Sequence, residues 1–291
     1  MVAPLLLLIY IDYILMGIPA FHAIARMEDT RTAAEMVVKV TASQWKWQYE
    51  YPEENIRFIS AMTTTQDQIH NREAKGEHYL QEVDNPLILP TNRKIRILLT
   101  STDVIHSWWV PALAVKKDAI PGFVNESWTR VEEPGLYRGQ CAELCGKDHG
   151  FMPIVVEVKS KADFATWLAE RKQAALAEKE LTSKQWSLEE LLARGEKAYN
   201  TTCAACHQPT GEGLPPMFPA LKGSPVATGP AEGHIATVVN GRPGTAMAAF
   251  GKQLSEVDLA AIITYERNAW GNKVGDMVTP QDIVAFKQAQ E

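Results

Sequence analysis

The chain opens on a long apolar run. Residues 2–25 hold one acidic side chain, Asp12, and no Lys or Arg, and their centre reads PLLLLIYIDYILMGIP. About twenty such residues match the hydrocarbon thickness of a bilayer. A cleaved signal peptide is the alternative, but the run has neither a basic start nor a small-x-small cleavage site. We expect a retained membrane anchor, with Asp12 facing a protein partner because a carboxylate is costly against lipid.

Between residues 33 and 159 the hydrophobic pattern changes to short runs of the strand type. The runs VVKV, RFIS, KIRILLTS and PIVVEV are separated by Pro, Gly and Asn signals. Within one of them, Ile95, Ile97 and Leu99 alternate with the basic Lys94 and Arg96. Several short strands of this kind predict a β-sandwich or barrel, and the pattern has no helical period of useful length.

From residue 160 the pattern becomes helical. The segment SKADFATWLAERKQAALAEKEL is rich in Ala, Glu and Lys, and Ser160 with Asp163 has the spacing of a capping box. It predicts a charged helix that ends in a linker near residues 182–185. Three further helix starts are expected, at Ser187 with Glu190, at Ser255 with Asp258, and at Thr279 followed by Pro280 and Asp282.

These patterns predict a multidomain chain. We expect an anchor helix and connector at 1–32, a β domain at 33–159, a charged helix and linker at 160–186 and an all-α domain at 187–291. The 291 residues have room for about two domains. Hydrophobic residues make up 46% and charged residues 22%, which excludes a disordered chain. The mean hydropathy of -0.18 is too polar for several membrane spans, and the net charge of -6 argues against nucleic acid as a partner.

One cysteine pair lies in the predicted all-α domain. Cys203, Cys206 and His207 form C-x-x-C-H, the attachment pattern of c-type haem. This spacing allows two thioether bonds to the haem vinyl groups and presents the imidazole to the iron. A structural zinc site is the alternative, but zinc needs two more ligands, and only His234 and no further cysteine follow. We therefore expect a covalently bound haem.

The second axial ligand decides what such a haem does. A methionine opposite the histidine gives a closed, high-potential haem suited to electron transfer. Met217 follows His207 too closely to wrap around the haem, whereas Met247 lies in the later loop GRPGTAMAAF. We expect Met247 to be the axial ligand and Met217 and Met277 to be packing residues. The motif, the stretch GEGLPPMFPALKGS and the late methionine loop together resemble class I cytochromes c.

The other cysteine pair lies near the end of the predicted β domain. Cys141 and Cys145 are followed closely by His149 and Met152, and His106 ends a strand farther upstream. Thiolates, imidazoles and a thioether suit copper. Two thiolates are one too many for a single type I copper, but they can bridge two copper ions. A Cys141–Cys145 disulfide is the alternative, although it does not explain why the histidines and the methionine stand at fitting places.

Four longer segments carry a family resemblance. They are QWKWQYEY, LQEVDNPLILP, DVIHSWWVPALAVKKDAIPG and PGLYRGQCAELCGKDHGFMPIVVEV. Over residues 4–170 the chain resembles subunit II of the haem–copper cytochrome c oxidases, and the fused haem segment makes it similar to the bacterial caa-type oxidases. The resemblance implies a cupredoxin-like Greek-key sandwich that holds the dinuclear copper centre CuA, followed by a class I cytochrome c domain.

The resemblance also implies a role for each ligand. Cys141 and Cys145 bridge the two copper ions, and His106 and His149 each bind one of them. Met152 is an axial ligand, and Glu143 contributes its backbone carbonyl. The Glu143 carboxylate is similar to one that reaches a magnesium ion at the interface with subunit I, and an exposed glutamate without a metal is the alternative.

Two further positions compare with the family. Trp45 matches the family's electron-input tryptophan, although Trp45 and Trp47 could both simply pack the sandwich. Lys46 stands where relatives often carry Tyr. Family members have two transmembrane helices, and only the second is seen in this sequence.

The resemblance implies the electron-input subunit of a respiratory cytochrome c oxidase. Electrons pass from cytochrome c or another donor through haem c and CuA to the haem a of subunit I, with subunit III as a further partner. Oxygen reduction, coupled to proton translocation, resides in the partner, because the histidines left over are too few and too scattered. The soluble domains are expected on the periplasmic side of the bacterial inner membrane.

Other functions fit the residues less well. An enzyme like nitrous oxide reductase needs a histidine-rich domain for its second copper centre. A membrane-anchored copper-delivery protein has no use for an attached haem. A stand-alone electron carrier differs only in lacking an oxidase partner, and a quinol oxidase subunit lacks the copper ligands.

Overall fold

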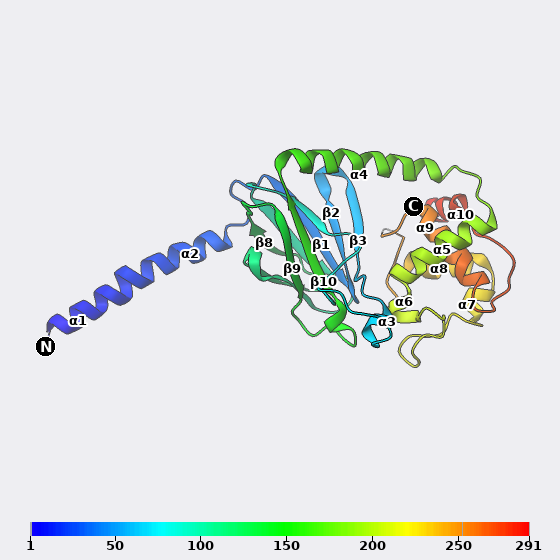
Figure 1. Cartoon of the computed structure of the whole chain (residues 1–291), viewed down its shortest axis with the longest axis horizontal. Helices are drawn as coiled ribbons and strands as arrows, with labels where there is room; N and C mark the ends of the chain where they lie inside the picture. The colour runs from blue at the N-terminus through cyan, green and yellow to red at the C-terminus, as the bar shows by residue number, and fades with distance from the viewer. Residues whose placement is uncertain (1, 252, 291) are drawn as a thin grey trace.

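The computed structural model describes residues 2–251 and 253–290. An apolar helix projects from a domain of two β-sheets, and a long helix, α4, runs from that domain towards a helical domain at the other end (Figure 1). This order of elements confirms the predicted fold: an anchor helix, a two-sheet β domain and a helical region.

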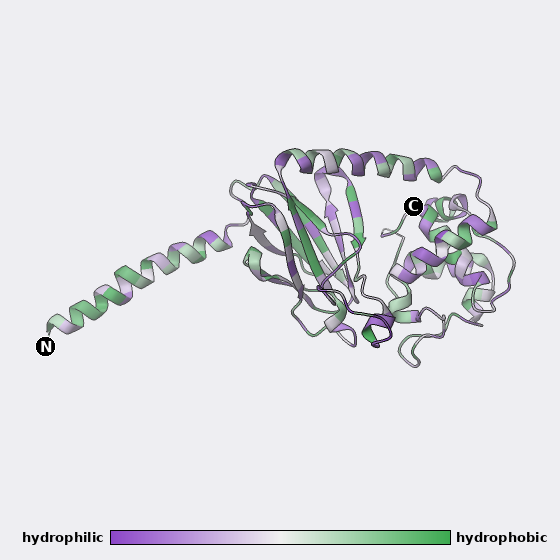
Figure 2. Ribbon diagram, in the orientation of Figure 1, coloured by the Kyte–Doolittle hydropathy of each residue, from purple (hydrophilic) through white to green (hydrophobic). Residues whose placement is uncertain are grey.

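The N-terminal helix is continuous from Val2 to Glu28, within the anchor and connector predicted at 1–32. It consists of α1 (Val2–Ile9), a π-helical segment η1 (Tyr10–Gly17) and α2 (Ile18–Glu28). Its side chains are exposed and mostly apolar (Figure 2). Among the described residues, this is the one helix long and apolar enough to cross a membrane.

Polar contacts join the end of this helix to the first sheet. The indole nitrogen of Trp128 donates to the Met27 carbonyl at 2.9 Å, and the Lys94 ammonium donates to the Asp29 carbonyl at 2.6 Å. Glu126 of the sheet accepts from the Thr30 hydroxyl, just after the helix, at 2.6 Å, and from Arg96 within the sheet, also at 2.6 Å. Hydrogen bonds, that of Arg96 first, lower the pKa of Glu126 to about 2. These contacts hold the helix end against the β domain.

The β domain is a sandwich of two five-stranded sheets. Every second side chain of the first strand is buried, including Val38 and Val40, because successive side chains of a strand point to opposite faces. Strands β1 and β5 pair in parallel, as do β4 and β10, and the other pairs are antiparallel. One sheet has the order β3 (Ile56–Ser60), β2 (Lys46–Tyr51), β1 (Met36–Ser43), β5 (Ile95–Ser101) and β8 (Asn125–Thr129). The other has the order β4 (Leu87–Pro90), β10 (Pro153–Lys159), β9 (Gly135–Cys141), β6 (His106–Val110) and β7 (Val115–Ala119).

Short helical turns interrupt the β domain, where no helix was expected. The turn α3 (Gln66–Ile69) is capped at its N-terminal end by a reciprocal capping box between Thr65 and Gln68, a pattern that the sequence contains. One turn is too short to show a helical period, which is why the pattern missed it. The remaining turns are the 3-10 helices η2 (Pro52–Glu54), η3 (Pro111–Leu113) and η4 (His149–Phe151).

Helix α4 (Lys161–Leu181) begins at the predicted cap, where Ser160 accepts from the Asp163 amide at 3.1 Å. The cap is not a reciprocal box, because the Asp163 carboxylate accepts from the Ser160 hydroxyl instead of the backbone. The first half of α4 packs on the β domain, where the Trp167 ring lies 5.3 Å from that of Tyr51. In its second half, Glu178 accepts hydrogen bonds from the helical domain. The helix is therefore attached at both ends and spans about 31 Å.

The helical domain follows a short connection after Leu181. The three helix starts predicted at Ser187, Ser255 and Thr279 are confirmed, since each side chain accepts from the backbone amide three residues later. The domain contains α5 (Leu188–Thr202), α6 (Ala204–His207), α7 (Pro225–Thr228), α8 (Ala231–Asn240), α9 (Glu256–Asn268) and α10 (Pro280–Gln288). An apolar cluster between α8, α9 and α10 forms part of its core.

Candidate functional site

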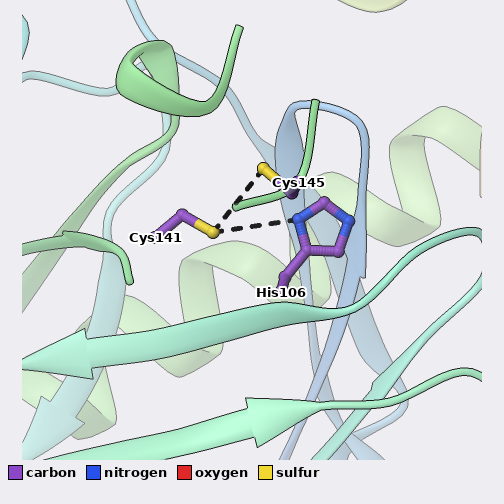
Figure 3. Close-up of side chains that lie close together, drawn as sticks. All are labelled: His106, Cys141 and Cys145. Atoms are coloured by element: carbon purple, nitrogen blue, oxygen red, sulfur yellow. Dashed lines mark hydrogen bonds between the residues drawn. The ribbon is translucent and has the colours of Figure 1, made fainter. Parts of the chain in front are cut away.

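The candidate copper ligands meet at one end of the β-sandwich. Cys141 ends β9, and Cys145 lies in the loop to β10. The prediction that His106 ends the strand of Lys94 is wrong: that strand, β5, ends at Ser101, and His106 starts the next strand, β6, after a short connection. The sheet thus brings distant residues together. The two sulfur atoms are 3.7 Å apart. His106 Nδ1 lies 3.9 Å from the Cys141 sulfur, and His149 Nδ1 lies 3.5 Å from the Cys145 sulfur. Figure 3 shows His106 turning a ring nitrogen towards Cys141.

The distance between the two sulfur atoms distinguishes a disulfide from a metal site at this cysteine pair. A disulfide needs about 2.05 Å between sulfurs. At 3.7 Å the Cys141 and Cys145 sulfurs are not bonded, and both side chains are free and buried. Each thiol has one imidazole nitrogen beside it. Two thiolates and two imidazoles so arranged are a donor set that fits a copper pair.

The other two candidate ligands lie next to Cys141. Met152 is 1% exposed, and its backbone carbonyl accepts from the Cys141 amide at 3.0 Å. The backbone carbonyl of Glu143 lies 3.4 Å from the Cys141 sulfur. Its side chain is exposed, so the carboxylate faces outward. Glu143 thus presents a carbonyl to the sulfur cluster and a carboxylate to the surface.

Hydrogen bonding favours the deprotonated form of one of the two thiols, Cys141. The hydrogen bond between the thiols lowers the pKa of Cys141 and, in return, raises that of Cys145. The thiolate is the form that binds metal.

Sequence reasoning missed two residues that orient this cluster. Asp103 Oδ1 lies 3.0 Å from His106 Nε2, on the far side of the ring from the sulfur. Burial favours the neutral acid, but hydrogen bonds, that of His106 first, lower the pKa of Asp103. Gln44 donates from its side chain to the Cys145 carbonyl at 2.8 Å. Asp103 stands three residues before His106, a spacing that could have pointed to this role.

We expect Asp103→Asn to weaken copper binding by about 10- to 100-fold, because the carboxylate that orients His106 loses its charge. Competition with a copper chelator measures the affinity. Asp118→Asn, an exposed position in β7, is the matched control and should leave the affinity unchanged. Equal affinities of the two variants would contradict a role for Asp103 at the metal.

The candidate haem ligands lie on one short helix. Cys203 caps α6, which carries Cys206 and His207. His207 Nδ1 lies 2.9 Å from the Pro219 carbonyl, which fixes the ring and leaves Nε2 as the free nitrogen. Both cysteines are free. A fixed imidazole with an available nitrogen beside two free thiols fits covalent haem attachment.

The methionines differ from one another in burial. Met247 is half-buried and packs against the apolar cluster of the helical domain. The prediction that Met217 and Met277 are packing residues is wrong in this structure, because they are 70% and 41% exposed. Met217 lies in the loop between Leu214 and Phe218, whose outward turn carries its side chain into solvent.

The segment around Trp45 lies where the β domain meets the helical domain. Trp45 is 6% exposed, and its indole nitrogen donates to the Cys145 carbonyl at 3.3 Å. Its ring lies 6.2 Å from that of Phe218, in an edge-to-face arrangement. Trp47 is fully buried, 6.2 Å from the His106 ring. Trp47 thus packs the sandwich, whereas Trp45 lies between the copper-ligand loop and the helical domain.

Comparisons with known proteins agree with this arrangement. Residues 36–159 match the family model for the periplasmic domain of cytochrome c oxidase subunit II. Residues 190–265 match the model for subunit III of cbb3-type cytochrome c oxidase, in agreement with a cytochrome c region.

The chain is also similar to individual proteins. A probable cytochrome c oxidase subunit 2 of Rickettsia bellii is 43% identical over 175 residues, which are 60% of this chain and 61% of that protein. Cytochrome c oxidase subunit 2 of Oncopeltus fasciatus is 42% identical over 159 residues, 54% of this chain and 67% of that protein. The crystal structure of the periplasmic domain of subunit II from Bradyrhizobium japonicum is 42% identical, with a TM-score of 0.43, and covers 48% of this chain and 96% of that one.

The chain spans 61% of the length of the Rickettsia bellii protein and 54% of that of a similar protein from Rickettsia prowazekii. Its two matched regions correspond to the β domain and to most of the helical domain. Three observations identify the family: the match to the family model, the 67% coverage of the Oncopeltus fasciatus protein, and the cysteines and histidines that converge in the β domain. This chain belongs to the cytochrome c oxidase subunit II family, with a cytochrome c region fused after the β domain.

Proposed function

We propose that the chain is the electron-input subunit of a respiratory cytochrome c oxidase. When bound, haem c and the dinuclear CuA centre each take up and release single electrons, so that the chain passes electrons from cytochrome c or another donor towards the haem a and oxygen-reducing site of subunit I. The observation that carries the proposal is the convergence of His106, Cys141 and Cys145, whose ligand atoms lie within 4.8 Å of one another.

In this proposal the β domain holds the copper ligands nearly still. His106 and Cys141 lie on neighbouring strands of one sheet, and the loop with Cys145 is fastened by hydrogen bonds from Gln44 and Trp45. Ligands supported in this way change position little when the charge of a bound metal changes. A small structural change upon reduction favours fast electron transfer.

The geometry of the β domain and the family both support the ligand assignments that we propose. Cys141, Cys145, His106 and His149 would hold the two copper ions, and Met152 and the Glu143 carbonyl would complete the site. Cys203 and Cys206 would hold the haem covalently, and His207 and Met247 would be its iron ligands. We assign the exposed Glu143 carboxylate to a magnesium ion at the interface with subunit I, and Trp45 to electron input.

The proposal extends to location and partners. The match to a periplasmic domain and the apolar N-terminal helix suggest that the chain is anchored in a membrane. We place residues 1–32 in and next to the bacterial inner membrane, with the domains at 33–159 and 187–291, joined by 160–186, on its outer side. Subunits I and III are the proposed partners within the membrane.

The axial assignment can be tested with two methionine variants. We expect Met247→Leu to leave the sixth position of the haem iron without a protein ligand, so that added imidazole or cyanide binds readily and the reduction potential falls. Met217→Leu is the matched control and should keep the spectrum and the potential of the original chain. Ligand binding in Met217→Leu alone would reverse the assignment. Optical titration and redox potentiometry of the purified chain measure both effects.

The proposed electron route can be tested by pulse reduction of the purified full chain. We expect the haem absorption of the reduced form to appear first and then to decay as the copper absorption bleaches, within one chain and at a rate independent of concentration. A concentration-dependent decay, or none, would reject the relay. Co-purification with a multi-span subunit that carries haem a separates the oxidase subunit from a stand-alone carrier.

A further inference from the structure

Lys46 is buried between the two domains. It starts β2, directly after Trp45, and is 8% exposed. Its ammonium group donates to the backbone carbonyl of Thr202 at 2.8 Å and lies 4.8 Å from the ring centre of Phe250. Both partners belong to the helical domain, so a side chain of the β domain inserts into its neighbour.

The position of the Thr202 carbonyl makes this contact favourable. Thr202 is the last residue of α5, and carbonyl groups in the last turn of a helix have no partner within the helix. The C-terminal end of a helix also carries partial negative charge. A buried ammonium group there satisfies one of the free carbonyls and meets the favourable end of the helix dipole. The face of the Phe250 ring adds an attractive cation–π contact.

Neighbouring contacts belong to the same interface. Phe218 of the helical domain is 4% exposed and packs in the apolar cluster of the β domain, with its ring against Trp45. Cys206 packs against that cluster too. The candidate electron-input tryptophan is thereby covered by the segment that carries the haem-attachment motif.

Helix α4 holds the two domains in this arrangement. On the β domain, Lys172 pairs with Glu54. At the other end, Glu178 accepts from Arg194 of α5 at 2.6 Å and from Ser255 at 2.7 Å. The connection between the domains is therefore mostly a helix that contacts both of them. The cytochrome domain is held against the β domain by these contacts in addition to the covalent connection.

We infer that Lys46 is a positioning residue that locks the fused cytochrome domain in place over Trp45. This domain, and no soluble protein, therefore covers the surface next to the copper-ligand loop. The inference rests on the proposed function and adds the interface through which the domains meet. A soluble donor then delivers its electron to the cytochrome domain and has no direct access to Trp45.

Hydroxyl-radical footprinting of the haem- and copper-loaded full chain tests the lock, because it reports the exposure of single side chains without any catalytic turnover. In the unaltered chain, Trp45 and Phe218 should be oxidised at least about tenfold more slowly than Phe123, which is 67% exposed. In Lys46→Met, which keeps the length and loses the charge, oxidation of Trp45 should rise about tenfold, as expected for loss of a charged hydrogen bond. Lys116→Met removes the same charge from the exposed strand β7 and should leave Trp45 protected.

A second measurement does not depend on any variant. Lysines of the unaltered, loaded chain are modified with an amine-reactive reagent, and Lys46 should react at least about tenfold more slowly than the exposed Lys116. Equal labelling of the two lysines overturns the inference, as does a protected Trp45 in Lys46→Met. Copper and haem contents of the same samples keep the two proposals apart. Missing cofactors reject the proposed function, whereas an exposed Trp45 in the fully loaded, unaltered chain rejects the lock alone.

Discussion

A Cys141→Ser variant is expected to lose both copper ions and to slow electron delivery to the partner subunit more than about a hundredfold. The Cys141 sulfur is the central atom of the cluster. It lies 3.7 Å from the Cys145 sulfur, 3.9 Å from His106 Nδ1 and 3.4 Å from the Glu143 carbonyl. Serine replaces a soft, polarisable donor by a hard oxygen that copper binds poorly. Metal analysis relative to haem measures the loss.

The control for this variant is Glu143→Gln, which removes the carboxylate and keeps the backbone carbonyl. It should retain both copper ions, because the side chain faces outward. If magnesium binds there as proposed, this control loses magnesium alone. Full copper occupancy in Cys141→Ser would show that Cys141 does not bridge the metals.

Removing the chain after Thr182 should have the second-largest effect. The shortened chain keeps the β domain and loses the cytochrome domain, so a soluble donor has to find the exposed Trp45 surface by diffusion. A tethered domain has an effective concentration on the order of millimolar, so at micromolar concentrations of a soluble donor we expect the step that reduces the copper site to slow at least about a hundredfold. Turnover should also become strongly dependent on salt, because exposed charges steer the encounter.

Steady-state oxidation of a soluble donor by the assembled complex, across a range of ionic strengths, measures both changes. The full-length complex is the reference. In it, the rate of electron transfer from the cytochrome domain to the β domain should depend only weakly on salt. Unchanged turnover and unchanged salt dependence in the shortened chain would mean that the fused domain is not the route of electron input.

Local signals predicted much of the fold. A helix cap depends on residues three positions apart, so the starts at Ser187, Ser255 and Thr279 can be read without knowing the fold. Alternating apolar residues likewise identified β5, because burial of one strand face imposes a period of two. The π-helical segment η1 has no such signal, since its sequence is uniformly apolar apart from Asp12.

The candidate copper ligands could be predicted because their chemistry is unusual. Two thiols, two imidazoles and a thioether seldom coincide, and the loop from Cys141 to Met152 contains all but one of them. The supporting contacts could not be predicted in the same way. Gln44 reaches the Cys145 carbonyl only because the two sheets bring β1 beside the ligand loop, and a common amide side chain has no sequence signature.

The contact between the domains depends on tertiary structure alone. Lys46 and Thr202 are far apart in sequence, and neither belongs to a motif. In the sequence, Lys46 is a charged residue between two tryptophans, and nothing there indicates that it contacts the helical domain. The docking explains why a lysine can be buried there, since the end of α5 supplies the carbonyl that its ammonium group needs.

Electron paramagnetic resonance of the oxidised, purified full chain, combined with its metal content, tests the central claim most directly. If Cys141 and Cys145 share a copper pair, each chain contains about two copper ions per covalent haem, and the unpaired electron shows hyperfine splitting from both copper nuclei. A signal split by a single copper nucleus, or a metal-loaded chain in which the two sulfurs are joined in a disulfide, would contradict the account.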